Sequence, residues 1–308
     1  MSPKTDPKGA HDADAGGTSE PELETSDTML APLYDIADEV LAAADLAGRA
    51  EHEDTSSYSF DAHILERGRR GLQSAVLLTK AGYWENCSAV TRQIFELLVN
   101  IEHLNSFPNR DEAQGLYTRF GIFQYFLAES KRLSFEKERG RPPNTRWENT
   151  VTDFLDGHCS AYKLPPRKDG TQHWQTHWSG RTTRALARSS PDPLRERQYE
   201  LLFSAWSEQA HAAPGVFATG LFDLYEQEVW EEELAKVKGK LPENFPLLTG
   251  GDRRAAQTLG MGIVLFLQLR QQLPGVPQST TEEIREFQNG VRKFMARKTS
   301  RPHLPIAD

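Results

Sequence analysis

Apolar side chains recur at helical spacing along most of this chain of 308 residues. Leu30, Leu33, Ile36, Val40 and Leu41 begin the pattern, and their positions are typical of one face of a helix. Further helices are expected over about 60–80, 84–104, 111–139, 145–162, 192–212, 216–238, 252–273 and 281–298. Strand-like alternation is absent, apart from short runs that helices absorb. The sequence therefore predicts an all-α fold, a bundle of several antiparallel helices.

The composition changes along the chain and suggests three parts. Residues 1–28 hold almost no large apolar side chain and mostly acidic charges, so they cannot bury enough surface to offset their ordering entropy. We expect a disordered leader there. A helical bundle domain is expected over 29–240, and residues 252–308 are expected to form a C-terminal helical extension packed on that bundle.

Several classes of protein are disfavoured by what the sequence lacks. The longest apolar run, Met261 to Leu267, is far shorter than the ~18–20 residues of a membrane helix. Two cysteines, Cys87 and Cys159, make neither a disulfide framework nor a four-ligand zinc site. There is no Gly-Lys-Ser/Thr phosphate loop, Gly-x-Gly-x-x-Gly, Gly-x-Ser-x-Gly or His-Glu-x-x-His motif. The sequence predicts a cytoplasmic protein with no membrane span, no bound metal and no cofactor.

The helix expected over 84–104 carries a polar row. Arg92 and Glu96 are i,i+4 neighbours whose side chains can meet, and Glu85, Ser88 and His103 fall on the same side of the helical wheel. The opposite side carries apolar residues, namely Val90, Ile94, Leu97, Ile101 and Leu104. The row fits either a solvated face with an ordinary surface ion pair or a functional stripe.

A second polar row lies on the helix expected over 192–212. Glu200, Ser204, Ser207 and His211 follow one another at spacings of four, three and four residues. One interpretation makes His211 a capping residue near the helix C-terminus. The other makes it a group that transfers a proton or contacts a phosphate.

The segment 137–188 is basic in a chain whose net charge is −8, because it holds ten Lys and Arg against five Asp and Glu. Its loop contains Trp174, His177, Trp178 and Arg181. Cations interleaved with tryptophans suit RNA or a nucleotide, since bases stack on aromatic rings while cations meet phosphates. The alternative is a loop anchored by two buried tryptophans with a solvated basic rim. His173 and His177 lack a third metal ligand.

Several segments, in this order and spacing, resemble a bacterial family of helical proteins labelled only as a domain of unknown function. They are Arg69 to Ala75 (RRGLQSA), Gly82 to Asn86 (GYWEN), Arg92 to Glu96 (RQIFE), His177 to Gly180 (HWSG), Tyr199, and Ser207 followed by His211. The resemblance covers roughly residues 60–225. It implies that Arg92, Glu96, Trp178, Ser207 and His211 belong to a shared site, and that Arg92 and Glu96 point inward.

A looser resemblance is to the HEPN superfamily of helical bundles, which includes RNases of toxin and phage-defence systems and also non-catalytic members. HEPN nucleases carry an Arg, four to six residues, and then a His at a helix start. Arg167 with His173 and Arg297 with His303 have this spacing, but the first pair lies in a Pro/Gly loop and the second in the tail.

Three functional hypotheses remain open, and whether the protein is an enzyme is undecided. In the first, it is a metal-independent, RNase-like enzyme of a defence or toxin system, in which His211 acts as acid or base, Arg92 holds a phosphate and Glu96 orients it. In the second, it is a non-catalytic module or sensor that binds a protein partner through residues 223–233 or 256–269. In the third, the polar residues form a network that only fixes the fold.

Overall fold

The computed structural model describes residues 26–54, 59–141, 144–203, 205–207, 250–276 and 281–299. The helices are α1 (Ser26–Asp54), α2 (Phe60–Lys80), α3 (Trp84–Asn105), α4 (Arg110–Glu138), α5 (Thr145–His158), η1 (Ser160–Tyr162), α6 (Thr183–Arg188), α7 (Arg195–Gln198), the π-helical η2 (Tyr199–Phe203), α10 (Gly250–Gln271) and α11 (Thr281–Thr299). The predicted all-α class is confirmed.

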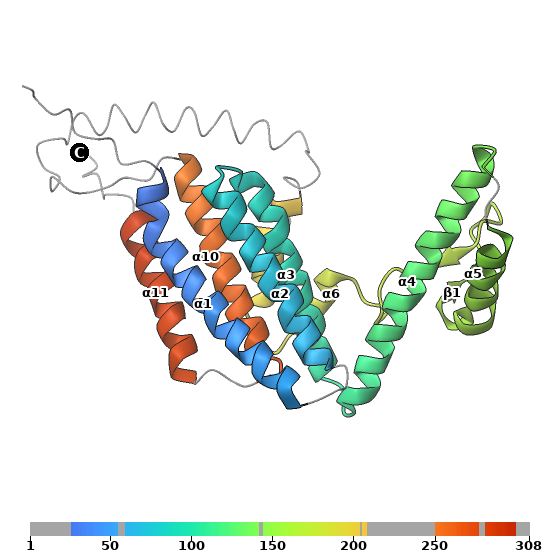
Figure 1. Cartoon of the computed structure of the whole chain (residues 1–308), viewed down its shortest axis with the longest axis horizontal. Coiled ribbons are helices and arrows are strands. Elements are labelled where there is room, and N and C mark those ends of the chain that lie inside the picture. The colour runs from blue at the N-terminus through green and yellow to red at the C-terminus, as the bar shows by residue number, and fades with distance from the viewer. Residues whose placement is uncertain are drawn as a thin grey trace, which may run out of the picture.

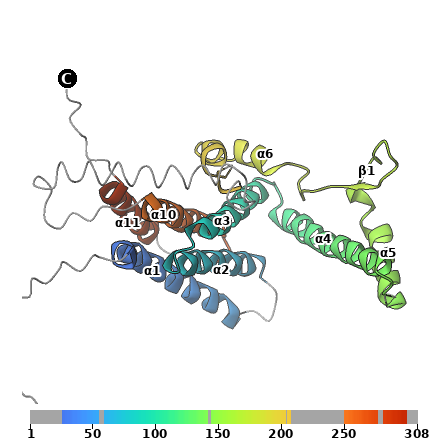
Figure 2. The ribbon, with the colours of Figure 1, turned by 90° about the horizontal axis from the view of Figure 1, so that it is seen from above.

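Helices α1, α2, α3, α10 and α11 lie side by side as one bundle (Figures 1 and 2). Helix α10 is central, since it packs against α1, α2, α3 and α11. Helix α3 packs against α2 and α10, and α6 also contacts it. Its polar row is in contact with protein as well, since Arg92 lies over the Phe203 ring and His103 packs against Trp178.

The helix ends follow from local capping chemistry. The side chains of Ser59, Asn109 and Asn144 each accept a hydrogen bond from a backbone N–H of the first turn of α2, α4 and α5, respectively. Helix α2 ends before Gly82, whose φ of 79° is a left-handed conformation that favours glycine. The reversal at Gly82 turns the chain from α2 directly into α3.

Helix α10 supplies much of the main core. Leu259, Ile263, Phe266 and Leu269 have no exposed surface. Gly68 on α2 permits close contact, because a Cβ there would lie 2.7 Å from the Leu269 Cδ2 atom. The segment 256–269, considered as a possible partner-binding surface, is therefore largely enclosed by the bundle, and that expectation is wrong. The division at residue 252 stays a prediction, although both sides of it contribute to one core.

Helix α4 projects away from the bundle and carries α5 and a small hairpin at its far end (Figures 1 and 2). Its 29 residues span about 43 Å at 1.5 Å per residue. The hairpin pairs β1 (Lys163–Leu164) with β2 (His173–Trp174), antiparallel, where the sequence showed no strand pattern. A second core, centred on Phe120, Phe123 and Leu155, stabilises this arm. The arm is defined here as residues 110–141 and 144–182.

One expected helix differs in form from the structure and is described only in part. Another lies entirely outside the described residues. The helix expected over 192–212 begins as α7, passes through the π-helical turn η2 and is helical again at residues 205–207. Residues 1–25 and 208–249 lie outside the described residues, and so do the helix expected over 216–238 and the acidic segment 223–233. None of the described helices combines the length and apolar character needed to cross a membrane.

Candidate functional site

Arg92 and Glu96 lie together on the side of α3 that faces η2. The Arg92 Nη2 atom lies 3.2 Å from the Glu96 Oε1 atom, and their side chains are 23% and 36% exposed. The Arg92 Cζ atom lies 4.4 Å from the centroid of the Phe203 ring. The Arg92 Nε atom is buried and has no hydrogen-bond partner in the described part of the chain. The guanidinium thus lies over an aromatic ring, while most of its donors have no partner among the described residues.

Phe203 is held in place by other aromatic rings. Its ring stacks on Tyr199 at 4.8 Å between centroids and contacts Phe95 on α3 at 5.7 Å. Ser207 follows one turn later, half-buried, and its Oγ atom donates a 2.7 Å hydrogen bond to the Phe203 carbonyl. Ser207 therefore lies one turn beyond the aromatic platform under Arg92. His211 lies outside the described residues.

Trp178 is attached to α3 one turn beyond Glu96. Its indole N–H donates a 2.6 Å hydrogen bond to the Asn100 Oδ1 atom, and the Asn100 side-chain amide donates one to the Glu96 carbonyl, also at 2.6 Å. The Trp178 ring packs against His103 and against Phe107 and Tyr117. This tryptophan anchors the loop to the bundle and does not offer an open ring for stacking.

We expect Trp178→Phe to lower the free energy of unfolding by about 1–2 kcal/mol, because the Asn100 oxygen loses its donor in a partly buried site. Urea unfolding followed by circular dichroism measures the loss. Trp174→Phe is the matched control, since Trp174 forms ring contacts but no described hydrogen bond from its indole nitrogen. Equal losses in the two variants would contradict the anchoring role of Trp178.

Among the described residues, no hydrogen bond, ion pair or ring contact joins Trp174, His177 or Arg181 to Arg92. Trp174 lies in the arm, where its ring contacts Phe123 and Lys163 lies over it. His177 is half-buried, and its carbonyl accepts hydrogen bonds from the Gln175 side chain and the Gly180 N–H. Arg181 is exposed. Burial, together with the nearby charge of Arg181, lowers the pKa of His103 below its usual value.

The structure also places one of the two Arg–His pairs with HEPN-like spacing. Arg167 lies in the turn of the hairpin, where its N–H bonds to the Thr171 carbonyl, and His173 lies on β2 opposite Leu164. The pair is therefore in an exposed hairpin and not at the start of a helix. Arg297 is on α11, and His303 lies outside the described residues.

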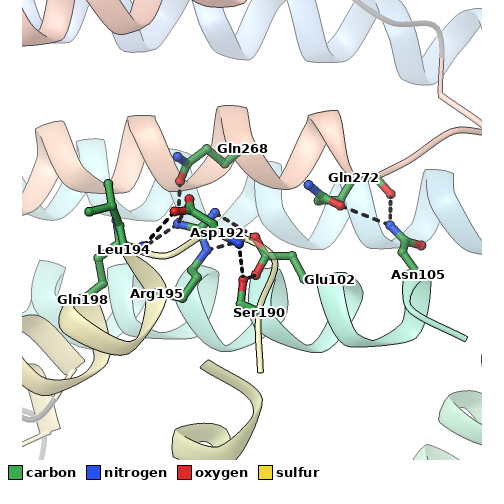
Figure 3. Close-up of polar contacts among 9 residues, drawn as sticks. All are labelled: Glu102, Asn105, Ser190, Asp192, Leu194, Arg195, Gln198, Gln268 and Gln272. Carbon is green, nitrogen blue, oxygen red and sulfur yellow. Dashed lines mark hydrogen bonds and ion pairs between the residues drawn. The ribbon is translucent and has the colours of Figure 1, made fainter. Parts of the chain in front are cut away.

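A buried polar cluster, which no pattern in the sequence indicated, holds the segment before η2 (Figure 3). The Arg195 Nε and Nη2 atoms donate to the Glu102 Oε1 atom at 2.9 and 2.8 Å, and both side chains are 2% exposed. Ser190 donates to the other Glu102 oxygen, and Gln268 on α10 accepts from Arg195. This cluster connects α7 to α3 and α10, so it fixes the start of the segment that carries Phe203.

Neither the two cysteines nor the described His, Asp and Glu side chains indicate a second catalytic or metal site. Cys87 is buried, and burial raises the pKa of its thiol, which disfavours the reactive thiolate. Burial raises the pKa of Cys159 in the same way. Within the described ranges, no three His, Cys, Asp or Glu side chains converge in a group able to hold a metal ion.

Comparison with known proteins gives one match. The model of a family of unknown function, DUF5677, matches residues 62–227, more than half of the chain and close to the range expected from the resemblance. The match includes Arg92, Glu96, Trp178 and Ser207. Neither a curated protein nor a solved structure matches the chain. The chain therefore belongs to DUF5677, a family of unknown function.

Proposed function

We propose that this protein is an RNA-directed, metal-independent enzyme that uses the α3 face around Arg92. In this proposal Arg92 binds a phosphodiester, Glu96 orients Arg92, and His211 donates or accepts a proton, with Ser207 beside it in the chain. Cleavage of a phosphodiester in this way needs a cation at the phosphate and a group that titrates near neutral pH. The proposal also places the protein in the cytoplasm, in keeping with two cysteines that are both buried and unpaired.

The contacts and the partial exposure of the Arg92 guanidinium support this proposal. It is stacked over Phe203, it makes a single described hydrogen bond, to Glu96, and its side chain is still 23% exposed. A planar guanidinium held in this way presents a rigid fork that matches two phosphate oxygens. A purely structural arginine would instead direct its donors to protein acceptors, as Arg195 does.

Expression in a bacterial host tests the proposal. We expect growth arrest with RNA degradation for the wild type, and neither effect for Arg92→Ala or His211→Ala at matched soluble levels. Arg285→Ala is the control, because Arg285 is an exposed arginine of α11, away from the Arg92 face. The melting temperature of each variant separates lost activity from lost stability. Growth arrest that persists unchanged in a folded Arg92→Ala variant would contradict the proposal.

A second candidate function is a non-catalytic interaction module, and the arm favours it. Ile122, Tyr125 and Phe135 on α4 are 43%, 56% and 55% exposed, although large apolar side chains are usually buried. Here a protein partner would contact α4. In affinity purification from the native host, a partner that wild type and Arg92→Ala retain alike, but a Tyr125→Ser/Phe135→Ser variant loses, would favour this candidate.

A further inference from the structure

A pocket lies between α2 and α3, outside the site discussed above. It has a volume of about 490 Å³ and is lined by His63, Glu66, Arg67, Arg70, Gly71, Ser74, Val90 and Gln93. This volume is within the range of small-molecule sites, roughly 300–1,000 Å³. Its lining from α3 comes from Val90 and Gln93, whereas Arg92 faces Phe203 on another side of that helix.

The charge of the pocket is positive, since its only carboxylate is already paired. Glu66 accepts two hydrogen bonds from Arg69, at 2.6 and 3.0 Å, and one from Arg70, at 2.5 Å. The hydrogen bonds from Arg69, followed by that from Arg70, hold the pKa of Glu66 at about 2. Arg69 is shared with Asp45, at 3.2 Å. Arg67 makes no described ion pair, so its charge is available to a ligand.

The remaining lining is neutral and partly apolar. Val90 is the apolar residue of the lining, and Gly71 adds no side chain to it. A Cβ on Gly71 would lie 3.1 Å from the Ile94 Cγ1 atom, so the glycine lets α2 approach α3 closely at the base of the pocket. Ser74 and Gln93 supply a hydroxyl and an amide, which donate and accept hydrogen bonds. The pocket thus offers cations along α2 and an uncharged space beside them.

We propose that the pocket between α2 and α3 binds a small phosphate ester with a planar, uncharged body, of the mononucleotide class. The phosphate would meet Arg67 and the outward donors of Arg70, since guanidinium groups recognise phosphate oxygens in pairs. The base would lie over Gly71 and against Val90, within reach of Ser74 and Gln93. This inference does not depend on the proposed RNA-directed activity, because no residue of the pocket belongs to the Arg92 face.

Isothermal titration calorimetry with the purified full chain tests the inference. The probes are the four ribonucleoside monophosphates, with inorganic phosphate and adenosine as partial ligands. We expect at least one monophosphate to bind at one equivalent per chain, more tightly than phosphate or adenosine. Arg67→Gln and Arg70→Gln should each weaken it about tenfold or more, the loss expected for one charge-assisted hydrogen bond. Arg285→Gln, an exposed control, should not change the affinity.

A pocket-filling variant tests whether binding requires the space of the pocket, without removing an arginine charge. Ser74 is exposed on the pocket wall, so Ser74→Trp should fill the space and abolish binding while the melting temperature stays unchanged. Arg92→Ala should bind the nucleotide normally, which separates this inference from the proposed function. Absence of binding by every monophosphate at millimolar concentration would overturn the inference, and so would full affinity in an Arg67→Gln/Arg70→Gln variant.

Discussion

Arg195→Met is expected to lower the free energy of unfolding by about 3–5 kcal/mol, because the substitution leaves Glu102 buried without its cation. Both side chains are 2% exposed, and Arg195 donates twice to one Glu102 oxygen. Water cannot replace the lost donors at such a depth without rearrangement. Urea unfolding followed by circular dichroism measures the loss.

Two further variants show whether burial causes the effect. The double variant Arg195→Met/Glu102→Leu should recover most of the stability, because the fully buried charges are then both removed. Asp192, which also pairs with Arg195 at 3.2 Å, keeps its charge but is 26% exposed and stays in contact with water. Arg184→Met removes an arginine from an exposed pair with Glu200, whose side chains are 56% and 49% exposed, and should cost about 0–1 kcal/mol. If Arg195→Met cost no more than Arg184→Met, the buried cluster would not stabilise the fold as described.

Phe266→Ala is expected to cost about 3–5 kcal/mol, since it removes a large ring from the centre of the bundle. Phe266 has no exposed surface, and a Cβ on Gly68 of α2 would lie 3.2 Å from its ring. Chemical unfolding should show one transition at a lower denaturant concentration, in which α2, α3 and α10 unfold together. The reason is that these helices share one core.

Phe135→Ala is the matched control for this prediction. The same ring is removed, but Phe135 is 55% exposed on the arm, so the change should stay within about 0.5 kcal/mol. A separate early transition for α10 in Phe266→Ala, with α2 and α3 unaffected, would show that α10 is an independent extension. That result would contradict its central place in the core.

Much of the fold was predictable because most helices bury one face, and such burial leaves a period in the sequence. Helices α2, α3, α10 and α11 begin and end within two residues of the expected positions. The central position of α10 was not predictable, since periodicity indicates which residues are buried but not which helix covers them. The interruption at Tyr199–Phe203 was not predicted either, because a shift of one residue over a single turn is too small to detect in a short apolar pattern.

The candidate site was predictable to the extent that it lies on one helix. The i,i+4 spacing of Arg92 and Glu96 indicated their ion pair. The inward position implied by the family resemblance stays a prediction, since the two side chains are 23% and 36% exposed. The Glu102–Arg195 pair could not be found, because 93 residues separate its members and each looks like an ordinary surface charge. Trp174 and Trp178 looked like one loop feature, yet Trp174 packs only against the arm core among the described clusters, whereas Trp178 packs against both that core and the bundle core.

Cleavage of a synthetic RNA by the purified protein tests the central claim most directly. A 5′-labelled oligoribonucleotide is incubated with the full chain in the presence of EDTA and resolved on a denaturing gel. We predict cleavage by the wild type and by Arg285→Ala, and none by Arg92→Ala, with all three proteins folded by circular dichroism. Equal cleavage by Arg92→Ala, or intact RNA with the folded wild type across oligonucleotides of varied sequence, would contradict the assignment of the α3 face around Arg92 to RNA.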